Sequence, residues 1–453
     1  MRTVFVLPAI ALGLVACAQN TASPPSAAAA AGTCGTDAST LVPAGVQITE
    51  AVAVEANTVR PPSVGTGPML AAHCKLTGRM EPRTGVDGKP YHIGFELRLP
   101  REWNGRFLYQ GGGGNDGVVR PAVGPQAAPG YALNRGFAVV TTDAGHQGPD
   151  ASFGFDPVAR VDNAYRAHDK VAVAAKEIVR RFYSKAPERS YFIGCSGGGR
   201  QGMMFTQRFP SYFDGVIAMA PAMRVSKGAT IAAAWDTQAL AAIAPQSADR
   251  KPIVSQALSD GDLALLRKGI LDACDAQDGA ADGLVSNPAA CRFDPRTLMC
   301  SSNAKAPDCL SPMQVGALKK MFAGPTDSSG RKLYFTWPWD PGIGHPQNDW
   351  RNWKLGNSAT AAPNSRHVVL MQDALQGYFV TPPDRSLTVF NFDFDRDPAR
   401  LDAHAWMFNT GDDIELAGFR ERNGKLLFAH GLADPIFSPD EMVDYYQRLS
   451  ARH

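Results

Sequence analysis

The chain has 453 residues, of which 44% are hydrophobic, so it can bury a large core and is longer than one ordinary domain. Its 45 basic and 43 acidic residues leave a formal net charge of +2, without a long run of one sign. This balance argues against nucleic acid as a partner and against a basic membrane-binding surface. We expect a soluble, globular monomer whose partner is a small molecule.

Residues 1–17 are typical of an export signal, with a positive charge on Arg2 and an apolar stretch, residues 4–15, too short to span a bilayer. The signal ends in Leu14-Val15-Ala16-Cys17, which is similar to a bacterial lipobox, so Cys17 is expected to carry a lipid anchor. The alternative is plain secretion with cleavage nearby. Residues 18–33 predict a flexible linker. We expect an exported bacterial protein, either a periplasmic or outer-membrane lipoprotein or a secreted one.

The chain contains eight cysteines, and exported proteins fold where disulfides persist. Without Cys17, seven remain, which is an odd number. We expect two local bridges, Cys274–Cys291 and Cys300–Cys309, and a third, Cys34–Cys74, that holds the N-terminal segment. Spacing alone does not fix this connectivity. Cys195 is left without a partner.

Residues 34–222 are predicted to form the first part of a catalytic domain in which strand-like and helix-like segments alternate. Apolar or period-two runs predict strands at 94–99, 105–109, 136–141, 191–193 and 215–219. Apolar residues at helical spacing predict a helix over 163–183, and a second helix is expected over 200–208. Such alternation predicts the α/β class, with a mainly parallel sheet and helices on both faces.

Residues 223–410 are expected to form an inserted lid or substrate domain, because Ala-rich helical stretches give way there to a region rich in tryptophan and proline. The pattern of the catalytic domain returns over 411–453. An apolar strand is predicted at 425–429, and it is followed by a closing helix over 439–448.

Gly194-Cys195-Ser196-Gly197-Gly198 is a G-x-S-x-G pattern between the strand at 191–193 and the helix at 200–208. Strand, sharp turn and helix are the context of a nucleophile elbow, which exposes the serine oxygen. Glycines beside the serine allow the backbone angles and the close packing that this turn needs. The alternative is a glycine-rich loop with an incidental serine. The two flanks favour Ser196 as a nucleophile.

Residues 193–200, 111–114 and 430–437 together resemble the tannase and feruloyl esterase family, and the likeness runs from about Cys34 to the C-terminus. The resemblance implies an α/β-hydrolase fold with a large lid, and it is greatest to family members that hydrolyse terephthalate monoesters. A cysteine directly before the nucleophilic serine, here Cys195, is unusual among α/β-hydrolases. In the family this cysteine is disulfide-bonded to the residue after the catalytic histidine.

A serine hydroxyl needs a base and an orienting carboxylate, in the order Ser, Asp, His. Asp434 is the expected acid, because it follows the strand at 425–429; the alternative is an Asp-Pro turn residue. The resemblance implies a His-Cys segment that would lie beyond His453, and His146 and His430 match family positions outside the triad. We therefore expect the chain as written to be inactive or nearly so, with residual turnover from the oxyanion hole alone.

The oxyanion hole needs backbone N–H groups that face the developing negative charge. Gly197, the residue after the nucleophile, is expected to supply one of them. The resemblance places the second at Gly114, with Gly113 lining the site. A phosphate-binding loop is the rival interpretation of the glycine run, but no Gly-Lys-Ser/Thr follows it.

The segment 275–284 has three closely spaced carboxylates with glycines between them, which suits one hard cation. The alternative is a set of Asp-Gly turns. The resemblance implies a structural Ca²⁺ site formed by the side chains of Asp275, Asp278 and Asp282 and the carbonyls of Ala280 and Leu284.

In the lid, Trp353 and Arg366 match family positions that line the acyl pocket, where the arginine pairs with a free substrate carboxylate. Taken alone, an arginine in a loop such as Arg366 is usually a solvated surface charge, and a neighbouring alignment favours His367. Phe437 is expected to contact the aromatic acid, and Leu370 replaces an aromatic residue of the terephthalate-specific members.

We expect a serine carboxylic-ester hydrolase that acts on esters of aromatic acids of terephthalate monoester, feruloyl or galloyl type. It forms an acyl-enzyme through a Ser-Asp-His triad whose histidine lies beyond this chain. The alternative is a catalytically impaired exported lipoprotein that binds aromatic carboxylates.

Overall fold

The computed structural model describes residues 34–35, 41–61, 67–127, 130–302, 305–346 and 349–452. The expected export signal, Cys17, the linker and His453 lie outside these residues. Within them, no helix combines the length and the apolar character that crossing a bilayer requires.

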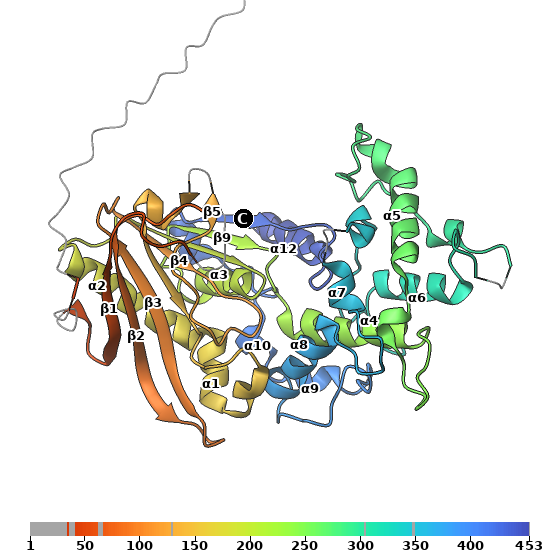
Figure 1. The fold of residues 1–453 in the computed structure, drawn as a ribbon, viewed down its shortest axis with the longest axis horizontal. Coiled ribbons are helices and arrows are strands. Elements are labelled where there is room, and N and C mark those ends of the chain that lie inside the picture. Colours follow the sequence, from red (N-terminus) through yellow and green to blue (C-terminus); the bar gives the residue numbers. More distant parts are fainter. Residues whose placement is uncertain are drawn as a thin grey trace, which may run out of the picture.

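The described residues form a sheet of eight strands in the order β1-β2-β3-β7-β4-β8-β9-β10 (Figure 1). The first three strands and their junction with β7 are antiparallel, and the strands from β7 to β10 are parallel. The strands are β1 (Val46–Val54), β2 (His73–Thr84), β3 (Pro90–Pro100), β4 (Arg106–Gln110), β7 (Ala138–Thr142), β8 (Arg189–Cys195), β9 (Gly215–Met219) and β10 (Lys425–Ala429). A small hairpin, β5 (Gln126–Ala127) and β6 (Gly130–Tyr131), lies apart from the sheet.

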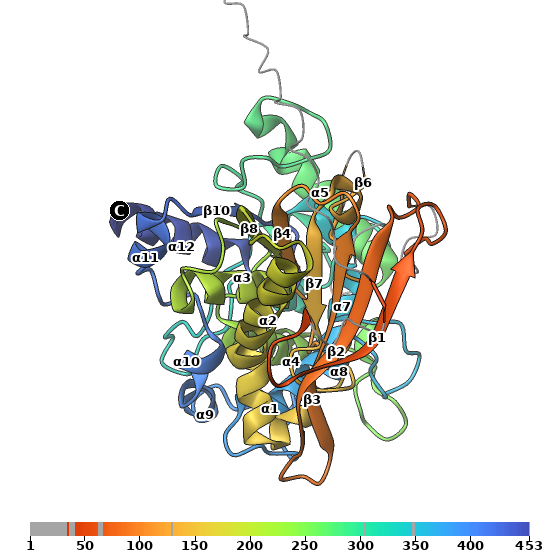
Figure 2. The same cartoon turned by 90° about the vertical axis from the view of Figure 1, so that its left-hand side faces the viewer.

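Three helices pack against one face of the sheet: α2 (Ala167–Phe182), α3 (Gly197–Arg208) and α12 (Pro439–Arg452). Figure 2 shows α2 and α3 in front of the strands. Val171 and Ile178 of α2 share a buried cluster with Leu97, Phe107 and Phe192 of the strands. The helix at 163–183 is confirmed, although its first turn, Asp162–Arg166, is a π-helix.

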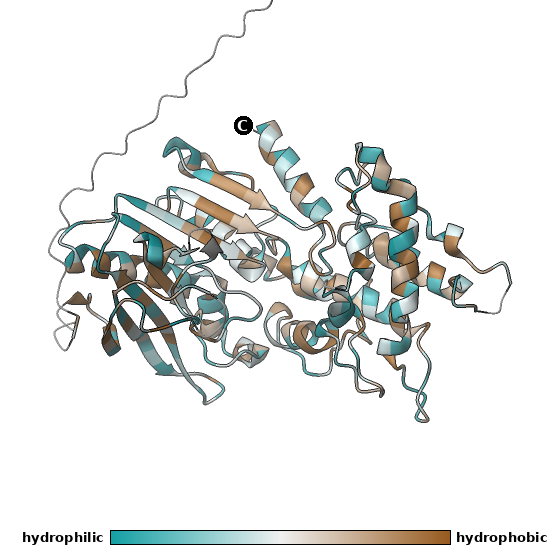
Figure 3. Ribbon diagram, turned by 45° about the horizontal axis from the view of Figure 1, so that its top comes forward, coloured by the Kyte–Doolittle hydropathy of each residue, from teal (hydrophilic) through white to brown (hydrophobic). Residues whose placement is uncertain are grey.

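On the opposite face, Leu70, Val123, Tyr131 and Leu133 form a buried cluster with Leu108 of β4 and Val139 of β7. Farther along the sheet, a hollow is lined by residues of β8, β9 and β10 and by Arg106, Phe137 and Lys425. Leu427 of β10 is 59% exposed there. In Figure 3 the strands beside α12 are brown over much of their length, whereas α12 itself mixes teal and brown.

Residues 223–410, which we call the lid, form a mainly helical body beside the sheet (Figure 1). Its helices are α4 (Ala233–Ala241), α5 (Asp260–Cys274), α6 (Pro312–Phe322), α7 (Trp350–Lys354), α8 (Arg366–Ala374), α9 (Pro398–Asp402) and α10 (Ala405–Phe408). Capping boxes at Ser259 and Ser311 fix where α5 and α6 begin. Two short helices outside the lid are α1 (Pro157–Val161) and α11 (Ala417–Glu421).

One buried cluster joins the lid to the sheet domain: Val368, Met371 and Leu375 of the lid share it with Phe153 and Phe437. A second cluster lies within the lid, around Leu266, Ile270 and Leu318. The lid therefore has a core of its own and is also fixed to the domain that carries Ser196.

The described residues contain the disulfides Cys34–Cys74, Cys274–Cys291 and Cys300–Cys309, with S–S distances of 1.99, 1.90 and 2.01 Å. These are the pairings expected from the sequence. Cys195 is a free, exposed thiol.

Candidate active site

Ser196 lies at the turn between β8 and α3, with φ 59° and ψ −121°. A non-glycine residue at positive φ is strained, and such strain is typical of functional turns. The Ser196 N–H donates to the Met219 carbonyl at 2.9 Å, which ties the turn to β9. The backbone of Gly194 packs against Gly198 so closely that a Cβ at Gly194 would lie 2.4 Å from the Gly198 oxygen.

Ser196 opens into a cavity of about 270 Å³ between the sheet domain and the lid. Six other expected residues line the same cavity, and they come from four separate parts of the chain: Gly113, Gly114, Gly197, Trp353, Arg366 and Phe437. Leu370 lines it as well. The fold thus brings the expected nucleophile, glycine loop and aromatic residues to one place.

Two side chains hold the glycine loop in place by accepting hydrogen bonds from its backbone N–H groups. Gly113 N–H donates to Asp116 Oδ1 at 2.8 Å, and Gly112 N–H donates to Gln201 Oε1 at 3.0 Å. Gln201 Nε2 in turn donates to Asp116 Oδ2 at 2.8 Å. Burial raises the pKa of Asp116 to about 6, against the lowering effect of the Gly113 N–H.

The two expected oxyanion donors lie next to each other. A Cβ placed on Gly197 would lie 3.3 Å from Gly113 Cα and 3.6 Å from the Gly114 nitrogen. Gly114 has φ 63°, a conformation that favours glycine. Gly197 is the first residue of α3, so its N–H has no acceptor within the helix and faces a region favourable to negative charge.

Asp434 follows β10, and its carboxylate is fixed by several donors. Oδ1 accepts the backbone N–H groups of Ile436 at 2.8 Å and Phe437 at 3.1 Å. Oδ2 lies 3.1 Å from His430 Nε2, which is also 3.2 Å from the Phe437 carbonyl. His430 is therefore a partner of the expected acid rather than of Ser196.

In the part of the chain that the structure describes, no histidine hydrogen-bonds to the Ser196 hydroxyl. His146 is 1% exposed, and its Nε2 lies 2.7 Å from the Asn115 carbonyl. Burial lowers the pKa of His146 to about 4 and that of His168 to about 3. Burial also holds the pKa of His367 well below its usual range. These three imidazoles are neutral and part of the packing.

The Cys195 thiol is close enough to the backbone of Ser196 and to the Asp434 carboxylate for both to affect its pKa. Its pKa is raised first by partial burial and then by the nearby Asp434 carboxylate. A raised pKa keeps the thiol protonated and so lowers its reactivity.

The expected calcium loop spans the end of α5 and the turn after it. Asp275 Oδ1 accepts the N–H groups of Asp282 at 3.2 Å and Gly283 at 3.1 Å, and Asp278 Oδ2 accepts the Ser286 N–H at 2.6 Å. Among the described residues, no three His, Cys, Asp or Glu side chains are gathered as a metal site. The oxygens of the loop are the hard donors that Ca²⁺ prefers, and the carboxylates are partly or fully exposed, so they can turn outward.

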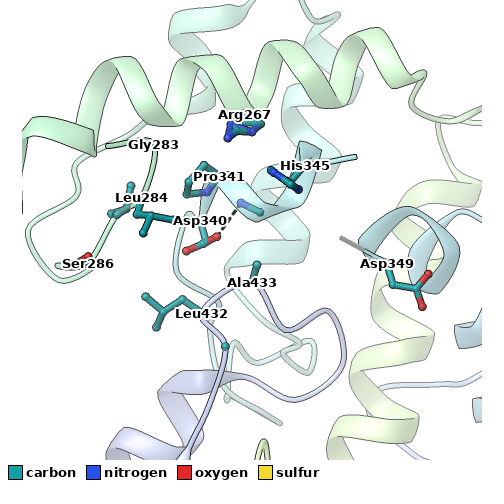
Figure 4. Close-up of a pocket in the computed structure, with 13 residues that line it drawn as sticks. Arg267, Gly283, Leu284, Ser286, Asp340, Pro341, His345, Asp349, Leu432 and Ala433 are labelled. Atoms are coloured by element: carbon teal, nitrogen blue, oxygen red, sulfur yellow. Dashed lines mark hydrogen bonds between the residues drawn. The ribbon is translucent and has the colours of Figure 1, made fainter. Parts of the chain in front are cut away.

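A larger cavity of about 640 Å³ lies between α5, the turn Gly283–Ser286 and the segment 431–433 (Figure 4). Asp340, Arg267 and His345 line it, and Asp340 Oδ1 accepts the Gly342 N–H at 2.7 Å. Its lining includes neither Ser196 nor the glycine loop. The smaller cavity is therefore the candidate active site.

Several residues of the site were not expected from the sequence. Trp337 Nε1–H donates to the Asp434 carbonyl at 3.1 Å, and Tyr378 O–H donates to Asn115 Oδ1 at 3.3 Å. Asn115 and Tyr378 both line the cavity, so this bond joins the lid to the loop that carries Gly114. In the sequence, the feature that could have identified Asn115 and Asp116 as site residues is their position directly after the glycine run.

A nucleophile elbow on a mainly parallel sheet, beneath a helical lid and facing a glycine loop, defines an α/β-hydrolase. The sequence model of tannase and feruloyl esterase matches residues 74–453. The chain belongs to this family of ester hydrolases.

Individual relatives agree with the family assignment. Mono(2-hydroxyethyl) terephthalate hydrolase of Piscinibacter sakaiensis is 42% identical over 433 residues, which cover 86% of this chain and 71% of that protein. An uncharacterized esterase of Xanthomonas campestris pv. campestris is 32% identical over 395 residues, which cover 84% of this chain and 64% of that protein. This chain thus spans about two thirds of the length of these relatives. The crystal structure of feruloyl esterase B from Aspergillus oryzae has a TM-score of 0.75 at 25% identity, covering 92% of this chain and 78% of that chain.

Proposed function

We propose that the protein is a serine carboxylic-ester hydrolase acting on esters of aromatic acids. The observation that carries this proposal is the strained, cavity-facing Ser196 beside two glycine N–H groups. In the proposed reaction Ser196 Oγ attacks the ester carbonyl, and the N–H groups of Gly114 and Gly197 stabilise the oxyanion. The alcohol leaves with a proton, and water then releases the acid from the acyl-enzyme.

Asp434 is proposed as the carboxylate that orients the catalytic histidine. Its support is a location directly after β10 and a carboxylate fixed by two backbone N–H groups. The base itself is not assigned to any described residue.

The aromatic acid is proposed to lie between Trp353 and Phe437, where the cavity is otherwise lined by Leu370, Met371 and Ile436. The names of the relatives support terephthalate monoesters and feruloyl esters as substrates. We also propose that the protein is exported, that it carries a lipid anchor and that it is a monomer.

A second candidate function is an impaired protein that binds aromatic carboxylates without turnover. It is favoured by the lack of a contact between Ser196 and any described histidine. Both candidates use the same cavity, but only the hydrolase needs a reactive Ser196. A reagent directed at reactive serines therefore distinguishes them.

The hydrolase proposal predicts that a fluorophosphonate probe labels Ser196, because a serine activated by a base attacks phosphorus as it attacks an ester; the second candidate predicts no labelling. Labelling should disappear in Ser196→Ala and persist in Ser211→Ala, an exposed serine outside the cavity. Intact-mass and peptide-mass analysis would locate the adduct. A protein that binds terephthalate but takes up no probe would instead be the non-catalytic binder.

We further propose that the loop of Asp275, Asp278 and Asp282 binds a structural Ca²⁺, with the Ala280 and Leu284 carbonyls as ligands. We expect 1 mM CaCl₂ to raise the midpoint of thermal unfolding relative to EDTA by about 2–4 °C, since a ligand that binds only the folded state stabilises it by about 2.7 kcal/mol at 100 times its Kd. Asp278→Asn should abolish this shift, whereas Asp272→Asn on the exposed side of α5 should not. An unchanged midpoint in the unmodified protein would rule the site out.

A further inference from the structure

The glycine loop, residues 111–114, lies against the start of α3, the helix that begins directly after Ser196. A Cβ on Gly198 would lie 2.7 Å from the Gly112 oxygen, so the loop and the first turn of the helix are in close contact. Gly114 itself is not held by packing, because a Cβ there would meet no atom within 4 Å. The direction of the Gly114 N–H therefore depends on how the rest of the loop is fixed to α3.

Two side chains connect the loop to α3 through three hydrogen bonds in series. Gly112 N–H donates to Gln201 Oε1, and Gln201 Nε2 donates to Asp116 Oδ2. Asp116 Oδ1 accepts the Gly113 N–H. Gln201 lies in the second turn of α3 and is fully buried. A carboxylate only accepts hydrogen bonds, and an amide has one accepting and one donating end, so the series can be completed in only one direction.

Asp116 is fixed in this place by the loop and by the same helix. A Cβ on Gly112 would overlap Asp116 Oδ1, so glycine at position 112 leaves the space that the carboxylate occupies. Arg200, the neighbour of Gln201 on α3, is 4% exposed and favours the ionised form of Asp116 electrostatically. The side-chain hydrogen bond and this positive charge thus both come from the helix that carries the nucleophile at its start.

We propose that Asp116 and Gln201 are positioning residues of the oxyanion hole, which fix the glycine loop on α3 and so aim its N–H groups. The Gly114 N–H is thereby kept beside the Gly197 N–H. Neither Asp116 nor Gln201 lines the cavity, so both act through the backbone of the loop. Donors that are fixed before the reaction stabilise the developing charge most, because they do not reorient during it. This inference rests on the proposed function, since it concerns the same oxyanion hole.

The direction of the hydrogen-bond series allows it to be tested by exchanging the two side-chain types. Asp116→Asn places an amide donor against the Gln201 amide, so one of the three bonds is lost whichever way the amides turn. Gln201→Glu places two carboxylates in contact. The double variant Asp116→Asn/Gln201→Glu reverses the middle bond, satisfies both backbone N–H groups and keeps the net charge. Each single variant is therefore expected to loosen the loop, and the double variant is expected to restore it.

Hydrogen exchange followed by mass spectrometry measures the loop without any chemistry at Ser196. We expect the backbone N–H groups of residues 112–113 to exchange about 10-fold faster in each single variant, the effect of losing one hydrogen bond. Exchange in the double variant should be close to the native rate. Peptides from the lid should be unaffected, which separates a local change from a general loss of stability.

Binding of phenylboronic acid measures the oxyanion hole itself. The Ser196 oxygen bonds to boron and loses its proton to the buffer, boron passes from three bonds to four, and a boron-bound oxygen occupies the oxyanion position. The ratio of the Kd in Ser196→Ala to the Kd in the parent protein isolates this step, and boron NMR detects the four-bonded boron. We expect each single variant to reduce this ratio about 10-fold and to leave the Kd in the Ser196→Ala background unchanged. The double variant should recover the ratio.

A purely structural role of the two residues would instead weaken binding equally with and without Ser196. The matched control is Asp249→Asn, which removes the same charge from an exposed part of the lid and should change neither the exchange of residues 112–113 nor the ratio. Single variants with native exchange and a native ratio, or a double variant no better than the single ones, would overturn the inference.

The same experiments separate this inference from the hydrolase proposal. If the parent protein forms no four-bonded boron, the hydrolase proposal fails. Faster exchange in the single variants that the double variant reverses would then still support the role of Asp116 and Gln201 in fixing the loop, and native exchange would overturn it.

Discussion

Gly194→Ala is expected to destabilise the protein by about 3 kcal/mol, the upper part of the range for overpacked sites. The added Cβ would lie 2.4 Å from the Gly198 oxygen and 2.5 Å from its carbonyl carbon, both of them backbone atoms. β8 and α3 cannot move apart without displacing Ser196. Labelling of Ser196 by the fluorophosphonate should therefore fall together with the free energy of unfolding. Urea unfolding and the labelling rate measure the two effects.

Gly316→Ala provides the matched control for this prediction. Gly316 lies inside α6, and a Cβ there meets no atom within 4 Å. Alanine is the better helix former, so this variant should be more stable by about 0.5–1 kcal/mol. If both variants behaved alike, the close approach of β8 and α3 would not be the reason for glycine at position 194.

Arg224→Ala is expected to destabilise the protein by about 3 kcal/mol, because it leaves a buried carboxylate without its cation. Arg224 Nη1 lies 3.2 Å from Glu441 Oε1 at the start of α12, where the Glu441 side chain is 2% exposed. The Tyr334 hydroxyl donates to Glu441 Oε2 at 2.6 Å. This cluster joins the lid to α12, so its loss should be visible in urea unfolding.

The destabilisation by Arg224→Ala should be larger at pH 8 than at pH 5. Burial raises the pKa of Glu441 above its usual range, and removal of Arg224 raises that pKa further. An acid with a raised folded-state pKa stabilises the protein at low pH, and this contribution is lost as the pH rises through the folded pKa. Adding Glu441→Gln to the Arg224 variant should therefore recover stability at pH 8.

The control for the Arg224 prediction is Arg101→Ala. Arg101 pairs with Glu55 at 2.9 Å, but the two side chains are 62% and 64% exposed. Such a pair is worth less than about 1 kcal/mol. A loss of equal size in both variants would contradict the role assigned to burial.

The parallel half of the sheet could be predicted because its strands are short apolar runs between clear turn signals. The expected strands at 215–219 and 425–429 have the observed bounds. β1 and β2 were not predicted. Their residues alternate between more and less buried positions with many polar side chains, so neither strand is a continuous apolar run in the sequence.

The site could be predicted where a local motif carries the chemistry, and not where distant segments meet. Ser196 and the glycine loop follow from strand-turn-helix and glycine patterns. The bond from Tyr378 to Asn115 and the pairing of Arg366 with Asp349 join residues that only the folded lid brings together.

Two of the three disulfides lie within the lid, where they close loops of 17 and 9 residues. Cross-links of this size contribute about 3 kcal/mol each. A recombinant host that keeps thiols reduced would therefore yield a protein with a less stable lid. Producing the protein in an oxidising compartment, or refolding it with a glutathione pair, is a condition for measuring any substrate preference at all.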